Sequence, residues 1–245
     1  MKKTIKIIFK KFLGENYYKL SNYYSLFMSR FGKRSYSQEG EDLILSRILD
    51  QKRCGFYVDV GAHHPHRFSN TYLFYRQGWR GINIDAMPGS MKPFKRYRPR
   101  DVNLEVGVLD KRGEMPFFIF NEPALNGFWP DEETAKAKNP GYQIVDVKSI
   151  PVFPLSEILL EHLPEDQSID FLTVDAEGRD YEVLSSNDWN AFSPNVVAVE
   201  VFGKDIKDLL SSQIGIYMAE VGYVLFSKSF NTVFFIKAKF LKMTG

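Results

Sequence analysis

Acidic, glycine and imidazole residues gather around one short apolar run. The run Phe56–Val60 contains Asp59 near its end, Gly61 follows it directly, and His63 and His64 come next. Such a run is typical of a parallel strand that is buried on both faces. A glycine behind it lets the chain turn sharply and lets a ligand approach the bare backbone, while Asp59 can hold that turn or the ligand. This order of residues predicts the beginning of a nucleotide-cofactor site.

The turn has too few glycines for a dinucleotide. A dinucleotide site requires Gly-x-Gly-x-x-Gly, because the pyrophosphate lies against bare backbone at a helix N-terminus. Here the second and third glycine positions are occupied by His63 and His66. A cofactor without phosphate fits such a turn better, and S-adenosylmethionine is the cofactor that we expect.

Other predicted strands also end in carboxylates, namely those before Asp85, Asp175 and Glu200. Because the carboxyl ends of parallel strands border one crevice, these side chains should lie close together. Asp85 is placed to accept hydrogen bonds from both ribose hydroxyls of a nucleoside, or else to cap a helix. Asp175 and Glu177 could bind a substrate hydroxyl, hold a divalent metal or act as a base. Glu177 could instead be an acid at a helix N-terminus, where the helix dipole stabilises its negative charge.

Three of the four histidines lie within four residues of one another, in the loop that follows Gly61. A neutral imidazole can take a proton from an attacking hydroxyl near pH 7, as O-methylation requires. His63 and His64 are therefore candidate bases. Hydrogen bonding within the loop is the alternative role for either of them.

Strands and helices alternate along most of the chain, which predicts a parallel sheet with right-handed crossovers. A final pair of strands suggests an antiparallel hairpin at the sheet edge. Proline-rich residues 121–142, between added strands at 115–120 and 144–152, are expected to form a loop or lid insertion. The expected core strands are 56–60, 81–85, 102–108, 169–174, 195–200, 223–227 and 232–238, and the expected helices are 69–77, 91–97, 155–162, 180–186 and 204–221.

The composition, with 44% hydrophobic and 25% charged residues among 245, is that of one globular α/β domain with an N-terminal extension. The single cysteine, Cys54, excludes an intramolecular disulfide and is expected to be a small core residue. We expect a cytoplasmic protein.

The extension, residues 1–35, is predicted to be a basic amphipathic helix. Residues 1–34 contain nine basic residues and one acidic residue. Interrupting lysines argue against a signal peptide, and a membrane span would need a longer apolar run. Residues 1–30 could contact the inner face of an anionic membrane peripherally, or pack on the catalytic domain or on a second subunit of an oligomer. No nucleic-acid partner is expected, since no RNA-recognition motif is visible.

Four motifs together resemble the FkbM-type family of S-adenosylmethionine-dependent methyltransferases, over roughly residues 36–237. The motifs are Ser37–Asp42, Phe56–Ala62, Gly81–Pro88 and Ile169–Gly178. The resemblance implies a Rossmann-like class I methyltransferase domain over residues 36–245. Its sheet would have seven mostly parallel strands, an antiparallel C-terminal edge hairpin and helices on both faces.

The resemblance also implies site residues. Asp175 and Glu177 match an Asp-x-Glu-Gly signature and join His63 and His64 as candidate catalytic residues. One departure is that many relatives have Glu at position 85 and Asn-Pro after it. The residues expected to bind the cofactor are Gln38, Asp42, Asp59, Gly61, Ala62, Asp85, Ala86 and Asp175.

We therefore predict O-methylation of a sugar hydroxyl, in the biosynthesis of a surface glycan or its nucleotide-sugar precursor. The acceptor would be a small molecule or saccharide. If it carries phosphates, these could bind to a basic segment of the chain, although that segment could instead be a solvent-exposed helix face. Two other functions stay open, namely a metal-dependent nucleotide-sugar enzyme resembling a glycosyltransferase and a non-catalytic membrane or partner module. The basic segment consists of Lys92, Lys95, Arg96, Arg98 and Arg100.

Overall fold

The computed structural model describes residues 14, 16, 18, 19, 32–49, 52–201 and 205–244. The chain divides into two units, Met1–Arg34 and Ser35–Gly245. Nearly all of the predicted amphipathic extension lies outside the described residues. Within the described part of the chain, no helix has both the length and the apolar character needed to cross a bilayer.

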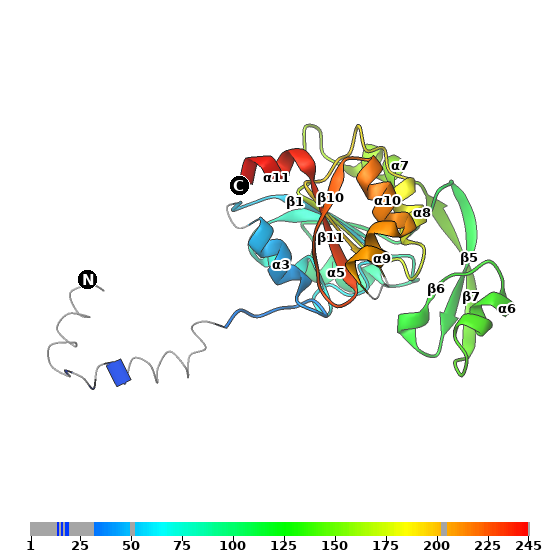
Figure 1. Ribbon diagram of the computed structural model, residues 1–245. Coiled ribbons are helices and arrows are strands. Elements are labelled where there is room, and N and C mark those ends of the chain that lie inside the picture. Colours follow the sequence, from blue (N-terminus) through cyan, green and yellow to red (C-terminus); the bar gives the residue numbers. More distant parts are fainter. Residues whose placement is uncertain are drawn as a thin grey trace. The chain divides into compact units, whose positions relative to one another are not determined.

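Seven strands form the large sheet, in the order β10-β11-β9-β8-β1-β2-β3 (Figure 1). The five strands from β9 to β3 run parallel, β11 is antiparallel to β9, and β10 is antiparallel to β11. This arrangement confirms the predicted class I sheet with its antiparallel C-terminal edge hairpin. The strands are β1 (Phe56–Val60), β2 (Arg80–Ile84), β3 (Val102–Leu104), β8 (Phe171–Val174), β9 (Val196–Glu200), β10 (Tyr223–Lys228) and β11 (Thr232–Lys237).

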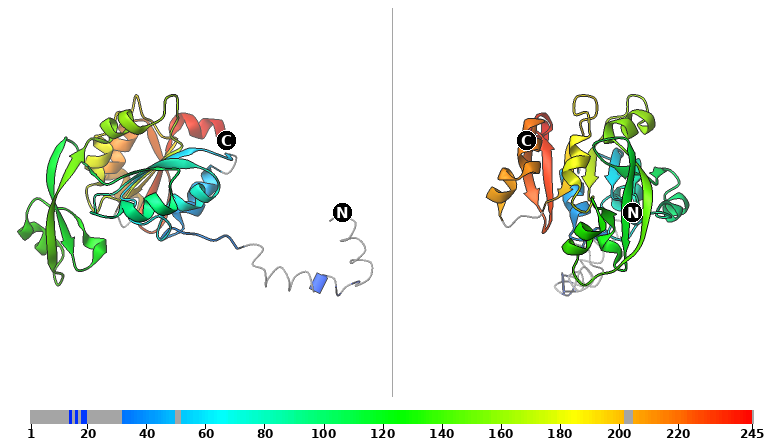
Figure 2. Two further views of the ribbon diagram at one scale, coloured as in Figure 1. Left: turned by 180° about the vertical axis from the view of Figure 1, so that it is seen from behind. Right: turned by 90° about the vertical axis from the view of Figure 1, so that its right-hand side faces the viewer.

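Helices cover both faces of this sheet (Figures 1 and 2). Successive residues of a strand point to opposite faces, so Tyr57 packs in one apolar cluster with α3 and α4, and Val58 packs in another with α7 and α8. All five residues of β1 are buried, as predicted for a strand covered on both sides. The helices are α3 (Glu41–Ile48), α4 (Tyr72–Arg76), α5 (Met91–Tyr97), α7 (Leu155–His162), α8 (Asp180–Ser185), α9 (Ile206–Ser211), α10 (Gln213–Glu220) and α11 (Ala238–Thr244).

The predicted helix over 204–221 is wrong as one element, because α9 and α10 are separate helices that meet at Ser212. The Ser212 backbone is extended, and its Oγ accepts a hydrogen bond from the Gly215 amide at 3.0 Å, so Ser212 caps α10. The predicted strand over 102–108 is also divided, because β3 joins the large sheet while β4 (Gly107–Val108) joins a second sheet. Cys54 is exposed rather than in the core.

The second sheet has four strands, in the order β4-β7-β5-β6, and its long strands stand beside the large sheet (Figures 1 and 2). Strands β5 (Gly113–Phe120) and β7 (Ile144–Phe153) pair antiparallel and confirm the two added strands. Residues 121–142 are not a plain loop. They contain a 3₁₀ turn (Pro123–Leu125), β6 (Gly127–Phe128) and α6 (Glu132–Lys138), and α6 contributes Ala135 to a small core with Phe118 and Phe120.

Candidate active site

The turn after β1 is built so that only glycine fits at position 61. Gly61 has φ +79°, and a Cβ atom there would lie 1.8 Å from the Asp175 carbonyl oxygen. The Gly61 and Ala62 amides both donate to the Ile84 carbonyl, at 2.9 and 3.0 Å. The carboxyl ends of β1, β2 and β8 therefore meet at this turn, as the sequence predicts.

Asp85 ties the turn to the end of β2. Its Oδ2 accepts a hydrogen bond from the His63 amide and its Oδ1 accepts one from the Met87 amide, both at 2.8 Å. Burial raises the pKa of Asp85, and these two hydrogen bonds oppose that effect. Since each carboxylate oxygen has a further lone pair, Asp85 can anchor the loop and still accept hydrogen bonds from a ligand. Its role in binding ribose stays a prediction.

Asp59 lies behind the turn and is buried. Its Oδ2 accepts a 2.6 Å hydrogen bond from the Thr71 hydroxyl, which itself accepts one from the Arg98 guanidinium at 2.9 Å. Burial raises the pKa of Asp59 to about 6, although Thr71 and Arg98 lower it. The sequence predicts that Asp59 holds either the turn or a ligand, and these contacts correspond to the first role.

Arg98 is fully buried, so this member of the predicted phosphate-binding segment is not available to a ligand. Its guanidinium donates to Asp101 at 2.9 Å and to the Tyr57 hydroxyl at 2.6 Å. The interpretation of Arg98 as a surface residue is therefore wrong. The sequence could not reveal this, because the partners come from β1 and from the turn that precedes β3.

The two candidate bases differ in their hydrogen bonding. The Nδ1 atom of His64 accepts from the Arg67 amide at 3.0 Å and from the His66 amide at 3.3 Å, so the neutral ring carries its proton on Nε2. Burial, and next the charge of His66, lower the pKa of His64. His63 is exposed, and its backbone amide is held by Asp85.

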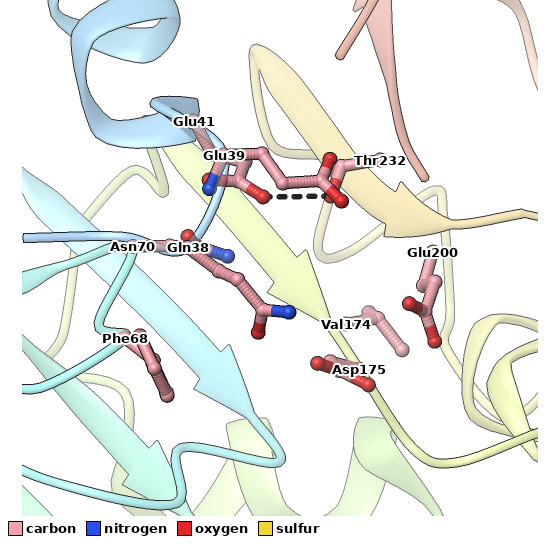
Figure 3. Close-up of a pocket in the computed structure, with 9 residues that line it drawn as sticks. All are labelled: Gln38, Glu39, Glu41, Phe68, Asn70, Val174, Asp175, Glu200 and Thr232. Atoms are coloured by element: carbon pink, nitrogen blue, oxygen red, sulfur yellow. Dashed lines mark hydrogen bonds between the residues drawn. The ribbon is translucent and has the colours of Figure 1, made fainter. Parts of the chain in front are cut away.

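A polar pocket opens at the carboxyl ends of β8 and β9 (Figure 3). Its residues come from the segment before and at the start of α3, from the loop after β1, from the ends of β8 and β9, and from the start of β11. Four of the side chains are carboxylic acids. The pocket is lined by Gln38, Glu39, Glu41, Phe68, Asn70, Val174, Asp175, Glu200 and Thr232.

The segment that carries Gln38 is fixed on both sides. Asp42 is buried behind it and accepts hydrogen bonds from the Ser35 and Ser37 hydroxyls, at 2.6 and 2.9 Å. The Glu41 carboxylate accepts one from the Thr232 hydroxyl at 3.2 Å (Figure 3). Gln38 thus faces the pocket, whereas Asp42 supports the segment, and their direct contact with a cofactor stays a prediction.

Apart from Val174, the last residue of β8, sequence reasoning missed five lining residues. Glu39 and Glu41 belong to the same acidic motif as Gln38, so the motif held a signal for them. Phe68, Asn70 and Thr232 carry no comparable signal, because they reach the pocket only through the fold. Of the predicted site residues, Gln38 and Asp175 line this pocket and the others do not. Among these others, Ala62 packs with Met91 and Phe94, and Ala86 packs against the core of the second sheet.

Three carboxylates form a compact cluster at the strand ends. Asp175, Glu177 and Glu200 each have an oxygen within 4.8 Å of the others. Desolvation and the charge of Asp175 raise the pKa of Glu177 to about 8, and they raise the pKa of Glu200 to about 8 as well. Both glutamates therefore hold a proton for most of the time at pH 7. A cation placed here would favour their ionised forms.

The second sheet borders this cluster. The Arg179 guanidinium donates a 3.1 Å hydrogen bond to the Phe128 carbonyl of β6. A Cβ atom built on Gly127 would lie 3.7 Å from the Glu177 Cβ. The insertion thus reaches the turn after β8, although its action as a lid stays a prediction.

Comparisons with known proteins identify the family of the chain. Residues 59–225 match the model of the methyltransferase FkbM domain. A TehB-like SAM-dependent methyltransferase from Corynebacterium glutamicum is similar in structure, with 15% identity and a TM-score of 0.39 over 89% of this chain and 97% of that one. No curated protein sequence matches the chain. Because the matched segment spans most of the chain and the sheet has the class I order, the chain belongs to the FkbM methyltransferase family, and S-adenosylmethionine is its methyl donor.

Proposed function

We propose that this methyltransferase transfers its methyl group to a hydroxyl oxygen of a saccharide, with His63 as the proton acceptor. The observation that carries this proposal is the position of His63. Its side chain is exposed in the cofactor turn, its amide donates to Asp85, and Gly61 of the same turn lies against the Asp175 carbonyl. An acceptor hydroxyl brought to this turn would have an imidazole beside it, a side chain that can serve as a general base.

The pocket fits S-adenosylmethionine in its charge. This cofactor carries positive charge on its sulfonium and on its ammonium group, and four carboxylic acids line the pocket. Those acids would hold the charged part of the cofactor, and Asp85 would accept hydrogen bonds from its ribose. Gly61 lets the turn after β1 approach the Asp175 carbonyl closely, which brings these two strand ends together at the site.

When bound, S-adenosylmethionine supplies a methyl group attached to a positively charged sulfur. Transfer of this methyl group to a hydroxyl oxygen would release the hydroxyl proton, and His63 would accept that proton. The other groups are less suited to this task. Glu177 and Glu200, with pKa values of about 8, hold protons at pH 7, and Nδ1 of His64 already accepts hydrogen bonds.

The saccharide acceptor is supported by the resemblance of the four motifs to a family that often methylates sugar or polyketide hydroxyls. The acceptor would belong to a surface glycan or to its nucleotide-sugar precursor. The basic residues among 1–30 support peripheral contact with an anionic membrane, where such polymers are assembled.

The test is methyl transfer from isotope-labelled S-adenosylmethionine to sugars, sugar phosphates and nucleotide sugars. Mass spectrometry would detect one added methyl group, and NMR would locate it. The proposal predicts a methyl group on a sugar oxygen. A methyl group on nitrogen or carbon, or a metal-dependent transfer of the sugar itself, would contradict it.

A further inference from the structure

Residues 61–100 have a strongly biased charge. They contain eight basic residues and a single acidic residue, Asp85. Asp85 is engaged with the backbone of the cofactor turn, and Arg98 is buried against Asp101. The exposed part of this segment is therefore basic, in contrast to the acidic pocket beside it.

Aromatic rings from this segment, together with Tyr36 from the segment before α3, form a connected series. Tyr36 lies 4.8 Å from Tyr72 between ring centroids, and Tyr72 lies 5.7 Å from His66 and 6.5 Å from Tyr75. His66 in turn lies 5.8 Å from Tyr97. The series joins the loop after β1 to α4 and to the end of α5.

Four exposed arginines lie over rings of this region. The guanidinium carbon lies 4.4 Å from the ring centroid for Arg67 over Phe68, and 5.3 Å for Arg96 over Tyr97. We call these arginines and rings the arginine–aromatic surface. Its other two arginines are Arg76, over Tyr36 at 5.7 Å, and Arg100, over Tyr75 at 4.2 Å.

Within the described part of the chain, these arginines are not neutralised by acids, although Arg76 donates to the Tyr36 hydroxyl and Arg100 donates to the Tyr75 carbonyl. Among the residues that the structure describes, none of the four forms an ion pair with a carboxylate. An arginine stacked on a ring still presents N–H groups at its edge, in the planar fork that matches phosphate. Arg98, by comparison, is buried and fully engaged.

The surface begins at the pocket. Phe68 lines the pocket, is 46% exposed, and carries Arg67 over its ring. Phe68 also adopts φ +56°, a conformation that costs free energy for a residue other than glycine and that is common at ligand sites. A ligand that enters the pocket from this side would therefore meet rings and guanidinium groups first.

We propose that the arginine–aromatic surface binds the phosphate of a phosphorylated saccharide acceptor, with the rings against the sugar. This inference rests on the proposed function, because it assumes a saccharide acceptor. The acidic pocket then takes the cationic cofactor and the basic surface takes the anionic acceptor. The opposite charges direct the two ligands to adjacent places.

The test is an NMR titration of the full chain with glucose 1-phosphate, with glucose and inorganic phosphate as comparison ligands. The proposal predicts that glucose 1-phosphate binds more tightly than either, and that Arg67→Ala and Arg96→Ala each weaken it by roughly tenfold, as expected for losing a charge-assisted contact. The matched control is Arg80→Ala. Arg80 is exposed at the amino end of β2, belongs to none of the four arginine–ring pairs above, and its loss changes the net charge equally.

Equal weakening by Arg80→Ala would overturn the proposal, since it would reveal only a general effect of charge. Absence of glucose 1-phosphate binding would also overturn it, as would arginine-dependent binding confined to anionic vesicles or to an oligonucleotide. The affinity for S-adenosylmethionine should stay the same in all three variants, which shows that they are folded. The titration needs no methyl transfer, so a failure of the proposed reaction would not be mistaken for a failure of this surface.

Discussion

The carboxylate of Asp85 accepts hydrogen bonds from the His63 and Met87 amides, and we expect it to bind the cofactor too. Asp85→Ala should weaken S-adenosylmethionine binding by roughly tenfold or more, because charge-assisted hydrogen bonds to the ribose are lost. Isothermal titration calorimetry would measure this. Asp131→Ala is the matched control, since Asp131 also accepts a backbone hydrogen bond, from Thr134, but caps α6 in the insertion. Equal affinities for wild type and Asp85→Ala would show that Asp85 only anchors the loop.

Glu200 should make the stability of the ligand-free protein depend on pH. Its pKa rises from an ordinary value of 4.5 to about 8, first because of burial and next because of Asp175. Between these two values the folded chain keeps a proton that the unfolded chain has lost. The free energy of unfolding must therefore fall as the pH rises through this range, and this loss is complete above about pH 8.

Thermal melting of wild type and Glu200→Gln from pH 5 to about 8.5 would check this expectation. The variant cannot ionise at this position, so its melting temperature should fall less with rising pH. Glu133→Gln, on the exposed surface of α6, should follow wild type. Parallel curves for wild type and Glu200→Gln would contradict the raised pKa.

At this scale the sequence predicts which residue types lie at the strand ends, but not their chemical state. Asp59, Asp85, Asp175 and Glu200 are recognisable because each follows or ends an apolar run. The tautomer of His64 depends on the amides of His66 and Arg67, which approach its ring only in the folded loop. Likewise, the raised pKa of Glu200 depends on neighbours from another strand.

Among the elements, the contact between the β1 turn and the end of β8 gives a sharp prediction. Gly61→Ala should strongly destabilise the fold or abolish cofactor binding, because its Cβ would lie 1.8 Å from the Asp175 carbonyl oxygen. Gly78→Ala is the matched control, since Gly78 also has positive φ, +99°, but a Cβ there has no neighbour within 4 Å. It should cost only about 1 kcal/mol of stability.

Thermal denaturation and calorimetry with S-adenosylmethionine would compare the two variants. Similar losses of stability would mean that backbone strain alone matters at Gly61, and that the close approach of the two turns is not essential.

Elements with a strong pattern are predictable and short ones are not. The run 56–60 agrees fully with β1 because it is a short continuous apolar run, and helix 155–162 agrees with α7 because its apolar residues have helical spacing. Strand β6 has only two residues, so it carries no period at all. The division at Ser212 depends on a cap whose hydrogen bond the hydropathy pattern does not reveal.

For the whole molecule, every residue of the candidate site lies in Ser35–Gly245. Removal of residues 1–34 should therefore leave the affinity for S-adenosylmethionine unchanged. Because these residues hold nine basic groups and one acidic group, the shortened chain should lose sedimentation with anionic vesicles that the full chain shows. Loss of cofactor affinity, or equal sedimentation of both chains, would contradict this division of roles.

Assembly of the pocket could not be predicted from the sequence. Glu41 and Thr232 are 191 residues apart and meet through a hydrogen bond at the pocket wall. The resemblance of the motifs drew attention to Gln38, but only the fold reveals that the start of β11 completes the same wall. Long-range pairing of this kind follows from strand order, which local patterns do not encode.

In the proposed reaction His63 takes the acceptor proton while other groups hold the cofactor. The most direct measurement compares His63→Ala with His64→Ala, by calorimetry for S-adenosylmethionine affinity and by kcat for methyl transfer to the saccharide acceptor. We predict that His63→Ala keeps the affinity near that of wild type and lowers kcat by about 10²-fold or more. His64→Ala, which removes a hydrogen bond acceptor within the loop, should lower kcat less. Full activity of His63→Ala would contradict the account.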